Sequence, residues 1–94
     1  MHDLHSKEAK ELYNALLSLK NEAEYKKFLA DLLTPAELRE FSNRWKVAQM
    51  LDAKIPYEEI EKVTGMSSTT IARISKWLSK GKNGYRMVLD RMKK

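Results

Sequence analysis

The sequence of 94 residues contains no cysteine, only three glycines and two prolines, and no long apolar run. Without cysteine the chain can form neither disulfide bridges nor thiolate metal sites, so it does not require an oxidising compartment. Its apolar runs are a few residues long, whereas a membrane-spanning helix needs about 20 apolar residues. The start, MHDLHSKEAK, lacks the basic and apolar segments that direct export. We therefore expect a cytoplasmic protein with no membrane partner.

Glycine and proline interrupt helices, and their scarcity here contrasts with abundant leucine, alanine, lysine and glutamate. Apolar residues also recur every three or four positions, which is the period of a helix with one buried face. The composition therefore predicts an all-α fold of about six helices in a single domain over residues 1–94. The predicted helices cover residues 6–19, 21 to about 32, 35–53, 56–64, 68–79 and 85 onward.

The third predicted helix has the clearest start signal. Thr34 can act as the N-cap, Pro35 suits the first helical position and Glu37 can complete a capping box. An apolar stripe follows, in which we take Trp45 as a packing residue. Together with the first two helices, this stripe offers more apolar surface than so short a chain can bury, so we expect a homodimer. The residues of the stripe are Leu38, Phe41, Trp45, Ala48 and Leu51.

Charge is unevenly distributed along the chain. The first 62 residues carry ten Lys/Arg against twelve Asp/Glu, whereas residues 63–94 carry eight Lys/Arg and a single acidic residue, Asp90. The last third therefore has a net charge of +7, which could attract a polyanion such as DNA. A solvated basic tail is the simpler alternative.

The segment IEKVTGMSSTTIARIS has the pattern of a helix-turn-helix, which we place at about residues 56–79. Gly65 can adopt the positive φ of a tight turn. The apolar residues able to pack the two helices together are Ile60, Val63, Met66, Ile71 and Ile74. Short polar side chains follow the turn, where a second helix reaches base edges in the major groove. The predicted DNA-contacting residues are Ser67, Ser68, Thr69, Thr70, Ala72, Arg73 and Lys76.

One position departs from the usual helix-turn-helix pattern. Glu61 stands where such motifs usually have alanine, which predicts a wider crossing of the two helices or an edge position for Glu61. Two ordinary core helices joined by a glycine are the simpler interpretation of the same residues. The basic bias after Val63 favours DNA binding.

A longer pattern resembles the tryptophan repressor family. It comprises Leu32-Leu33-Thr34-Pro35-x-Glu37, then Arg44, then Gly65-x-x-x-x-Thr70-Ile71-x-Arg73, and covers about residues 32–80. The chain as a whole looks like the small YerC/YecD branch of that family. The resemblance implies six helices per chain and an intertwined homodimer, whose N-terminal and long helices interlock. It also implies paired reading heads on a palindromic operator in double-stranded DNA, about one helical turn apart.

The resemblance further implies a candidate effector pocket formed by Arg44, Thr70, Arg73 and Ile74. In the tryptophan-responsive members the indole lies between two arginines, whose positions Arg44 and Arg73 match. The family glycine after the second arginine is Ile74 here, and added bulk in a packed site costs about 1–3 kcal/mol. We therefore do not expect tryptophan to be a corepressor, and any other small-molecule effector is unknown. The two arginines would then be free for a phosphate or a carboxylate.

Catalytic and metal-binding sites are not predicted. The two histidines, His2 and His5, lie near the start of the chain, and no serine or threonine has a plausible histidine base. We expect no enzyme activity, no metal and no cofactor. Trp77 is open to three interpretations, a core residue, a dimer contact or a stacking surface, of which core is the default. In the last segment we expect Val88 and Leu89 to pack inward and Arg86 to stay in solvent.

Two functions compete. The leading prediction is a homodimeric, sequence-specific DNA-binding transcriptional regulator, most simply a repressor. The alternative is a helical protein-interaction module that keeps the fold without the DNA role. The two differ in salt dependence, because phosphate contacts make affinity fall steeply as salt rises.

Overall fold

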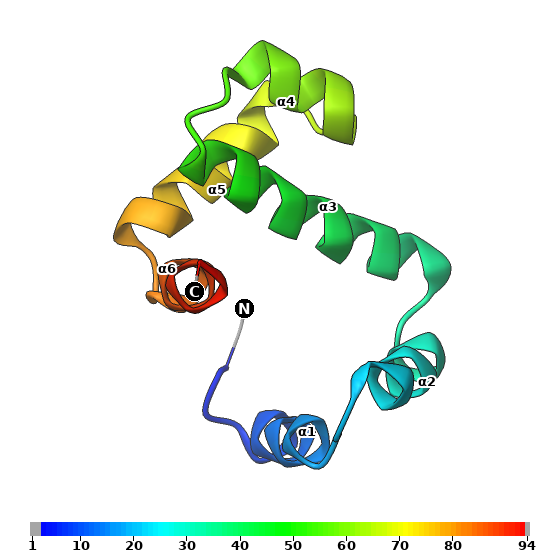
Figure 1. The fold of residues 1–94 in the computed structure, drawn as a ribbon. Coiled ribbons are helices and arrows are strands. Elements are labelled where there is room, and N and C mark those ends of the chain that lie inside the picture. Colours follow the sequence, from blue (N-terminus) through cyan, green and yellow to red (C-terminus); the bar gives the residue numbers. More distant parts are fainter. Residues whose placement is uncertain (1–2, 94) are drawn as a thin grey trace. The chain divides into compact units, whose positions relative to one another are not determined.

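The computed structural model describes residues 3–93, so His2 lies outside the described residues. The described part of the chain contains six α-helices and no strand (Figure 1). They are α1 (Lys7–Leu17), α2 (Glu22–Leu32), α3 (Pro35–Asp52), α4 (Tyr57–Thr64), α5 (Ser68–Lys80) and α6 (Gly84–Met92). The all-α prediction is confirmed, with helix boundaries close to those expected. Within residues 3–93, no helix has the length and apolar character needed to cross a membrane.

Side-chain caps fix where the helices begin. The N–H of Glu24 donates to Asn21 Oδ1 at 3.0 Å, so Asn21 caps the start of α2. At α3 the capping box is reciprocal, since the N–H of Glu37 donates to Thr34 Oγ1 at 3.0 Å and the N–H of Thr34 donates to Glu37 Oε1 at 2.8 Å. A cap of this kind stabilises a helix by about 1 kcal/mol. The local sequence therefore determines these helix starts.

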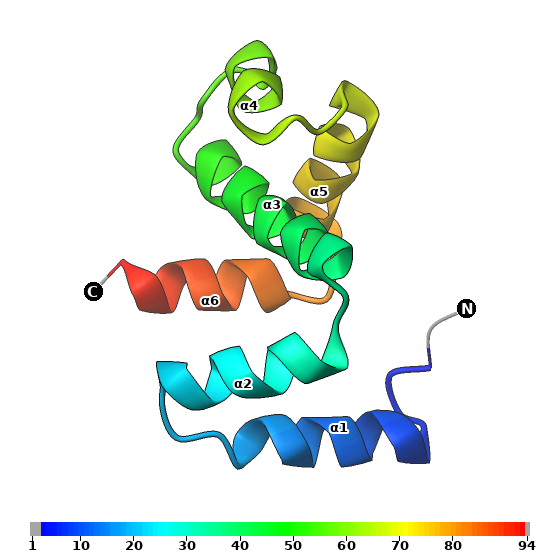
Figure 2. The ribbon, with the colours of Figure 1, turned by 90° about the vertical axis from the view of Figure 1, so that its right-hand side faces the viewer.

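The chain divides into two compact units, one ending at Leu38 and one beginning at Arg39. The first unit contains α1 and α2, which run in nearly opposite directions (Figure 2). No residue of Lys7–Leu17 or Glu22–Leu32 is buried, and Leu17 is 80% exposed. The apolar residues of this unit thus lack a core of their own in the single chain. That residues 1–94 form one domain stays a prediction.

The second unit holds the hydrophobic core, where α3, α4 and α5 meet. Its fully buried side chains are Val47, Ala48, Ile60, Ile71 and Ile74. Burial of one valine or isoleucine side chain contributes about 1.5–3 kcal/mol.

Val63 was predicted to join this core, and that prediction is wrong because its side chain is 56% exposed. Thr64 is the residue of α4 that lies next to Ile60 on the inward face, at 9% exposure. Its hydroxyl is satisfied because Thr64 Oγ1 donates to the carbonyl of Ile60 at 2.8 Å. Thr64, a polar residue, thus occupies the place in the core for which the sequence pattern predicted Val63.

Replacing Gly65 with alanine should destabilise the protein by about 1–2 kcal/mol, because Gly65 has φ +72° and an L-residue is disfavoured there. A Cβ at Gly65 would meet no atom within 4 Å, so the backbone conformation alone requires glycine. Gly84→Ala is the matched control, since its Cβ also meets nothing within 4 Å and its φ is not positive. Urea unfolding measures both variants, and equal stability losses would refute this explanation of the turn.

Candidate nucleic-acid interface

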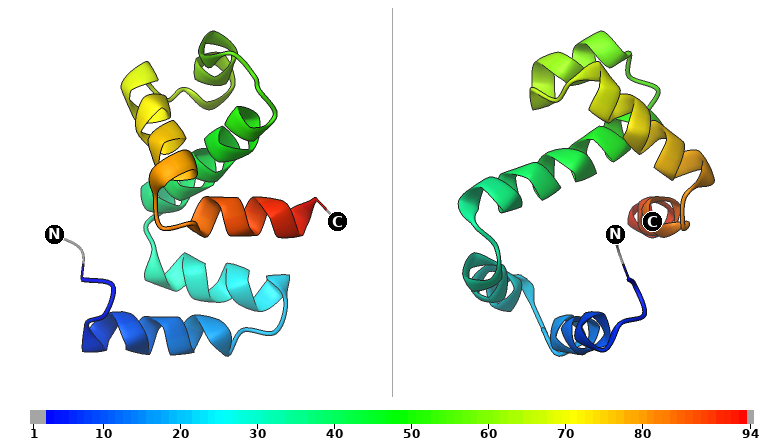
Figure 3. Two further views of the ribbon diagram at one scale, coloured as in Figure 1. Left: turned by 90° about the vertical axis from the view of Figure 1, so that its left-hand side faces the viewer. Right: turned by 180° about the vertical axis from the view of Figure 1, so that it is seen from behind.

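Helix α4, a tight turn and α5 form a helix-turn-helix (Figure 3). The N–H of Gly65 donates to the carbonyl of Glu61 at 2.8 Å, which ends α4. The N–H of Met66 donates to Thr64 Oγ1 at 3.2 Å, and Thr64 in turn bonds to the carbonyl of Ile60. These bonds fix the direction in which α5 leaves the turn.

Two of the predicted DNA-contacting residues also build the start of α5. The N–H of Thr70 donates to Ser67 Oγ at 3.2 Å, and Ser67 Oγ donates to Thr70 Oγ1 at 3.2 Å. Ser67 is therefore the N-cap of α5, and Thr70 is half-buried beside it. Their hydroxyl groups are engaged within the motif itself.

One face of α5 is polar and exposed, and the opposite face is apolar and buried. Spacings of three and four residues place Thr69, Ala72, Arg73 and Lys76 on the same side of a helix. Ile71 and Ile74 are fully buried on the other side. The structure thus gathers most of the predicted DNA-contacting residues on one surface of α5. The exposed members are Ser67, Ser68, Thr69, Ala72, Arg73 and Lys76.

The residues of the predicted effector pocket have different environments. Arg44 Nε donates to Glu40 Oε2 at 3.2 Å, and the Arg44 guanidinium lies 6.0 Å from the centroid of the Phe41 ring. Arg73 is exposed on α5. Ile74 is fully buried in the core, which includes Ala48 of α3. Of the two arginines predicted to be free for an anion, Arg44 is thus engaged within its own helix.

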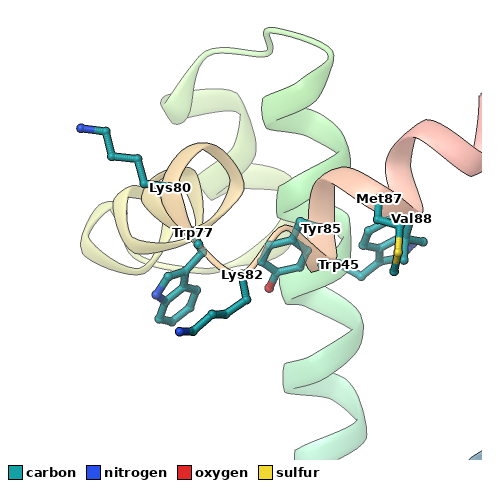
Figure 4. Close-up of a pocket in the computed structure, with 9 residues that line it drawn as sticks. Trp45, Trp77, Lys80, Lys82, Tyr85, Met87 and Val88 are labelled. Atoms are coloured by element: carbon teal, nitrogen blue, oxygen red, sulfur yellow. The ribbon is translucent and has the colours of Figure 1, made fainter. Parts of the chain in front are cut away.

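A groove of about 790 Å³ lies at the end of α5 and along α6, with one side chain from α3 (Figure 4). We call it the aromatic groove and define it by Trp45, Trp77, Tyr85, Met87 and Val88. The rings of Trp45 and Tyr85 are stacked, with centroids 6.4 Å apart and an interplanar angle of 18°. Burial raises the pKa of Tyr85, an effect that the positive charge of Arg44 partly opposes.

The aromatic groove corrects two sequence predictions. Trp77 is 43% exposed, so the default interpretation of a core residue is wrong for the single chain. Val88 is 37% exposed and lines the groove, whereas Leu89, at 6% exposure, packs inward as predicted. The sequence did not predict the groove because its residues come from three helices. The one local signal was the short segment that carries Trp77, Lys80, Lys82 and Tyr85.

Ion pairs hold α6 against the end of α3. Arg86 Nη2 lies 3.0 Å from Asp52 Oδ1, and Arg86 Nη1 lies 3.3 Å from Asp90 Oδ1. Lys93 Nζ lies 3.1 Å from Asp52 Oδ2. Arg86 therefore does not stay free in solvent, as the sequence suggested, because two carboxylates bind its guanidinium. Asp52, at 15% side-chain exposure, is the centre of this cluster.

Replacing Asp52 with asparagine should lower the free energy of unfolding at pH 7, and the difference between variant and parent should disappear in acid. The hydrogen bond from Lys93, followed by that from Arg86, holds the pKa of Asp52 below its usual value. The pKa of Asp52 is lower in the folded protein than the value of about 3.9 in the unfolded chain, so its ionised carboxylate stabilises the fold at pH values above about 3.9. This stabilisation is lost as the pH falls through the lower pKa of the folded state. Urea unfolding at pH 7, 5 and 3 should show the gap between parent and variant closing below about pH 4. A gap that stays constant, or one matched by Asp31→Asn on α2, would contradict this role.

The order of the helices and the geometry of α4 and α5 define an all-α helix-turn-helix protein. A family profile described as "Trp repressor protein" matches residues 7–93, and the chain belongs to this family. It is 41% identical over 90 residues to the uncharacterized protein YerC of Bacillus subtilis (strain 168), an alignment that spans 96% of this chain and 86% of YerC. The resemblance to the YerC-like branch is therefore confirmed.

Two solved structures share the fold. The crystal structure of a TrpR-like protein from Eubacterium eligens ATCC 27750 matches with a TM-score of 0.90 and 36% identity, over 95% of this chain and 92% of that chain. A crystal structure from Staphylococcus aureus matches with a TM-score of 0.89 and 38% identity, over 96% of this chain and 90% of that chain. The fold of the chain is therefore that of the TrpR-like proteins.

Proposed function

We propose that the chain is a homodimeric, sequence-specific DNA-binding transcriptional regulator, most simply a repressor. The observation that carries this proposal is the two-faced helix α5, which we call the reading helix. Its polar face exposes Ser68, Thr69 and Arg73, while Ile71 and Ile74 anchor it in the core. A helix presented in this way fits the major groove, which is about 12 Å wide. Membership of the Trp repressor family supports the same class of function.

Electrostatics favour an approach of DNA through the reading helix rather than through α4. Arg73 and Lys76 are exposed on the reading helix, within the segment of net charge +7. The first turn of α4 instead carries Glu58 and Glu59, which would repel phosphates. We therefore propose Ser68 and Thr69 as base contacts and Lys76 as a phosphate contact.

The homodimer is proposed from the exposed apolar residues of the first unit. Neither α1 nor α2 buries any of its residues within one chain, although Leu12, Tyr13 and Leu17 line α1. A second copy would cover such surface, and its reading helix would supply a second half-site contact. Two reading heads about 34 Å apart would bind a palindromic operator.

Selection from a random double-stranded DNA library tests this function. The purified protein should enrich a palindrome whose half-sites lie about one helical turn apart, because each reading helix binds one half-site. Failure to enrich any sequence would overturn the proposal. That result would favour a helical protein-interaction module, the alternative that the exposed aromatic groove supports.

Free tryptophan should neither bind the protein nor alter its affinity for DNA. Ile74 fills the core beside Ala48, and Arg44 is paired with Glu40, so no slot for an indole is expected between α3 and the reading helix. A ligand that does not bind cannot shift the orientation of the reading heads. Calorimetry should show no saturable heat for tryptophan beyond that of a leucine control. A saturable signal below millimolar, at one site per chain, would disprove the prediction.

A further inference from the structure

A second pocket, of about 420 Å³, lies where the end of α3, the second half of α5 and the start of α6 meet. It shares only Gly81 with the lining of the aromatic groove, and none of the four residues of the predicted effector pocket lines it. Pockets of about 300–1,000 Å³ are large enough for small molecules. The polar and charged residues that line this one, which we call the α3–α6 pocket, are Asp52, Lys54, Ser75, Ser79, Asn83 and Arg86.

Lys54 lines the α3–α6 pocket in a backbone conformation that lysine rarely adopts. Its φ is +65°, and it follows the end of α3 in a Schellman motif. In this motif the N–H of Lys54 donates to the carbonyl of Leu51 and the N–H of Ile55 donates to the carbonyl of Met50, both at 3.0 Å. Glycine is the usual residue at this position, because a side chain is unfavourable at positive φ. Lysine in this place therefore marks a candidate functional position.

Asn83 lines the same pocket and also has a positive φ, of +71°. Within residues 3–93, Lys54 and Asn83 are the two non-glycine residues in this conformation. Asparagine tolerates it better than lysine does. The two residues lie in different loops, with α4 and α5 between them in the chain, so no local pattern brings them together. Unusual backbone conformations cluster at binding sites, and their meeting here favours a binding role for the pocket.

The pocket contains one positive charge that has no counter-ion in the chain. Arg86 is paired with Asp52 and Asp90, and Asp52 is also paired with Lys93. Lys54 forms no ion pair with any of residues 3–93. The lining residues Lys54, Arg86 and Asp52 thus sum to a charge of +1, which favours an anion as the ligand.

Hydrogen-bond donors surround this charge. The guanidinium of Arg86 has five N–H groups, and its two bonds to carboxylates leave others free. The side chains of Ser75 and Asn83 form no hydrogen bond with the part of the chain that the structure describes, and each can donate. A cation together with hydroxyl, amide and guanidinium donors suits the oxygens of a phosphate or carboxylate group.

We propose that the α3–α6 pocket binds a small organic anion through a phosphate or carboxylate group. The Lys54 ammonium is the charged contact, and the side chains of Ser75, Asn83 and Arg86 donate hydrogen bonds to the ligand. Because Ser75 belongs to the reading helix and Lys54 follows α3, a bound anion would join these two helices. This site goes beyond the proposed function, since it does not depend on DNA binding.

An NMR titration of the full chain with inorganic phosphate, and a second one with acetate, tests the site. Each anion replaces chloride at constant ionic strength, so that general screening does not change. The backbone amide signals of Lys54, Ser75 and Asn83 should shift and saturate with at least one of the two anions. Saturation by one anion alone would identify the group that the ligand carries. If neither anion gave a saturable shift, the inference would be overturned.

Lys54→Gly should move ligand affinity and stability in opposite directions. It should weaken binding of the saturating anion by about tenfold or more, the loss expected for one charged hydrogen bond. It should also raise the melting temperature, because glycine accepts φ +65° without strain. A residue that serves only the fold could not give this combination. If this variant failed to fold, Lys54→Asn would replace it, since asparagine removes the charge and tolerates positive φ.

Lys62→Ala is the matched control, because Lys62 is exposed on α4 and does not line the pocket. It should leave the affinity for the anion unchanged. Parent-like affinity in the Lys54 variant, or an equal loss in the Lys62 variant, would refute the site. Neither measurement uses DNA, so a protein that bound the anion and enriched no DNA sequence would refute DNA recognition and leave this site standing.

Discussion

Replacing Ile74 with alanine should lower the free energy of unfolding by about 2–5 kcal/mol, the cost of removing a large aliphatic side chain from a packed core. Ile74 is fully buried and lies in the same cluster as Val47 and Ala48, so it joins the reading helix to α3. Because small domains are stable by only about 5–15 kcal/mol, this one change could remove much of the stability. Urea or thermal unfolding measures the loss.

The control for this substitution is Val63→Ala, at a side chain that is 56% exposed. Truncation of an exposed side chain usually changes stability by about 0.5 kcal/mol or less. Similar losses of unfolding free energy at both positions would show that Ile74 does not contribute to the stability of the core as described. Ile74→Gly should cost about 1 kcal/mol more than the alanine variant, because glycine is unfavourable within a helix. Any tryptophan binding gained in that variant is expected to be weak.

Substitutions on the polar face of the reading helix should separate sequence recognition from general attraction to DNA. Ser68→Ala or Thr69→Ala should reduce the preference for the selected sequence by about 1–3 kcal/mol per lost base contact, because both side chains are exposed near the start of α5. Lys76→Ala should weaken binding to all sequences alike, as expected for a phosphate contact. Fluorescence anisotropy with selected and random duplexes measures both effects.

Ser79→Ala provides the matched control on the same helix. Ser79 is exposed like Ser68, but it lies near the end of α5, and its hydroxyl donates to the carbonyl of Ser75 at 3.2 Å. The Ser79→Ala substitution should leave the affinities for the selected and the random duplex unchanged. If Ser68, Thr69 and Lys76 variants all bound both duplexes like the parent, the reading helix would be wrongly assigned.

The helices and the turn could be predicted from the sequence because short-range rules determine them. Thr34 and Glu37 form their capping box from positions three residues apart, and Gly65 takes the positive φ that few other residues tolerate. The polar face of α5 follows from helical periodicity alone. Short-range sequence patterns are therefore sufficient to predict these helices, the turn and the polar face of α5.

Contacts between distant residues could not be predicted in this way. Arg86 donates to Asp52, which lies 34 positions away in the chain. The sequence around Arg86 therefore predicted a charged residue on a helix but not its partner. Trp77 and Val88 were expected inside because they are apolar, yet they line a groove that the single chain leaves open. The hydropathy of a residue does not show which of its neighbours in the fold leave it uncovered, because those neighbours lie on other helices.

The most direct test of DNA recognition is the affinity for the selected palindrome and for a random duplex, measured at 50 and 200 mM salt. If each dimer neutralises about six to ten phosphates, both affinities should fall by about 10³–10⁵-fold over this range. The palindrome should remain the tighter ligand at both concentrations. Affinities that barely change with salt, or that are equal for the two duplexes, would contradict a sequence-specific DNA-binding function.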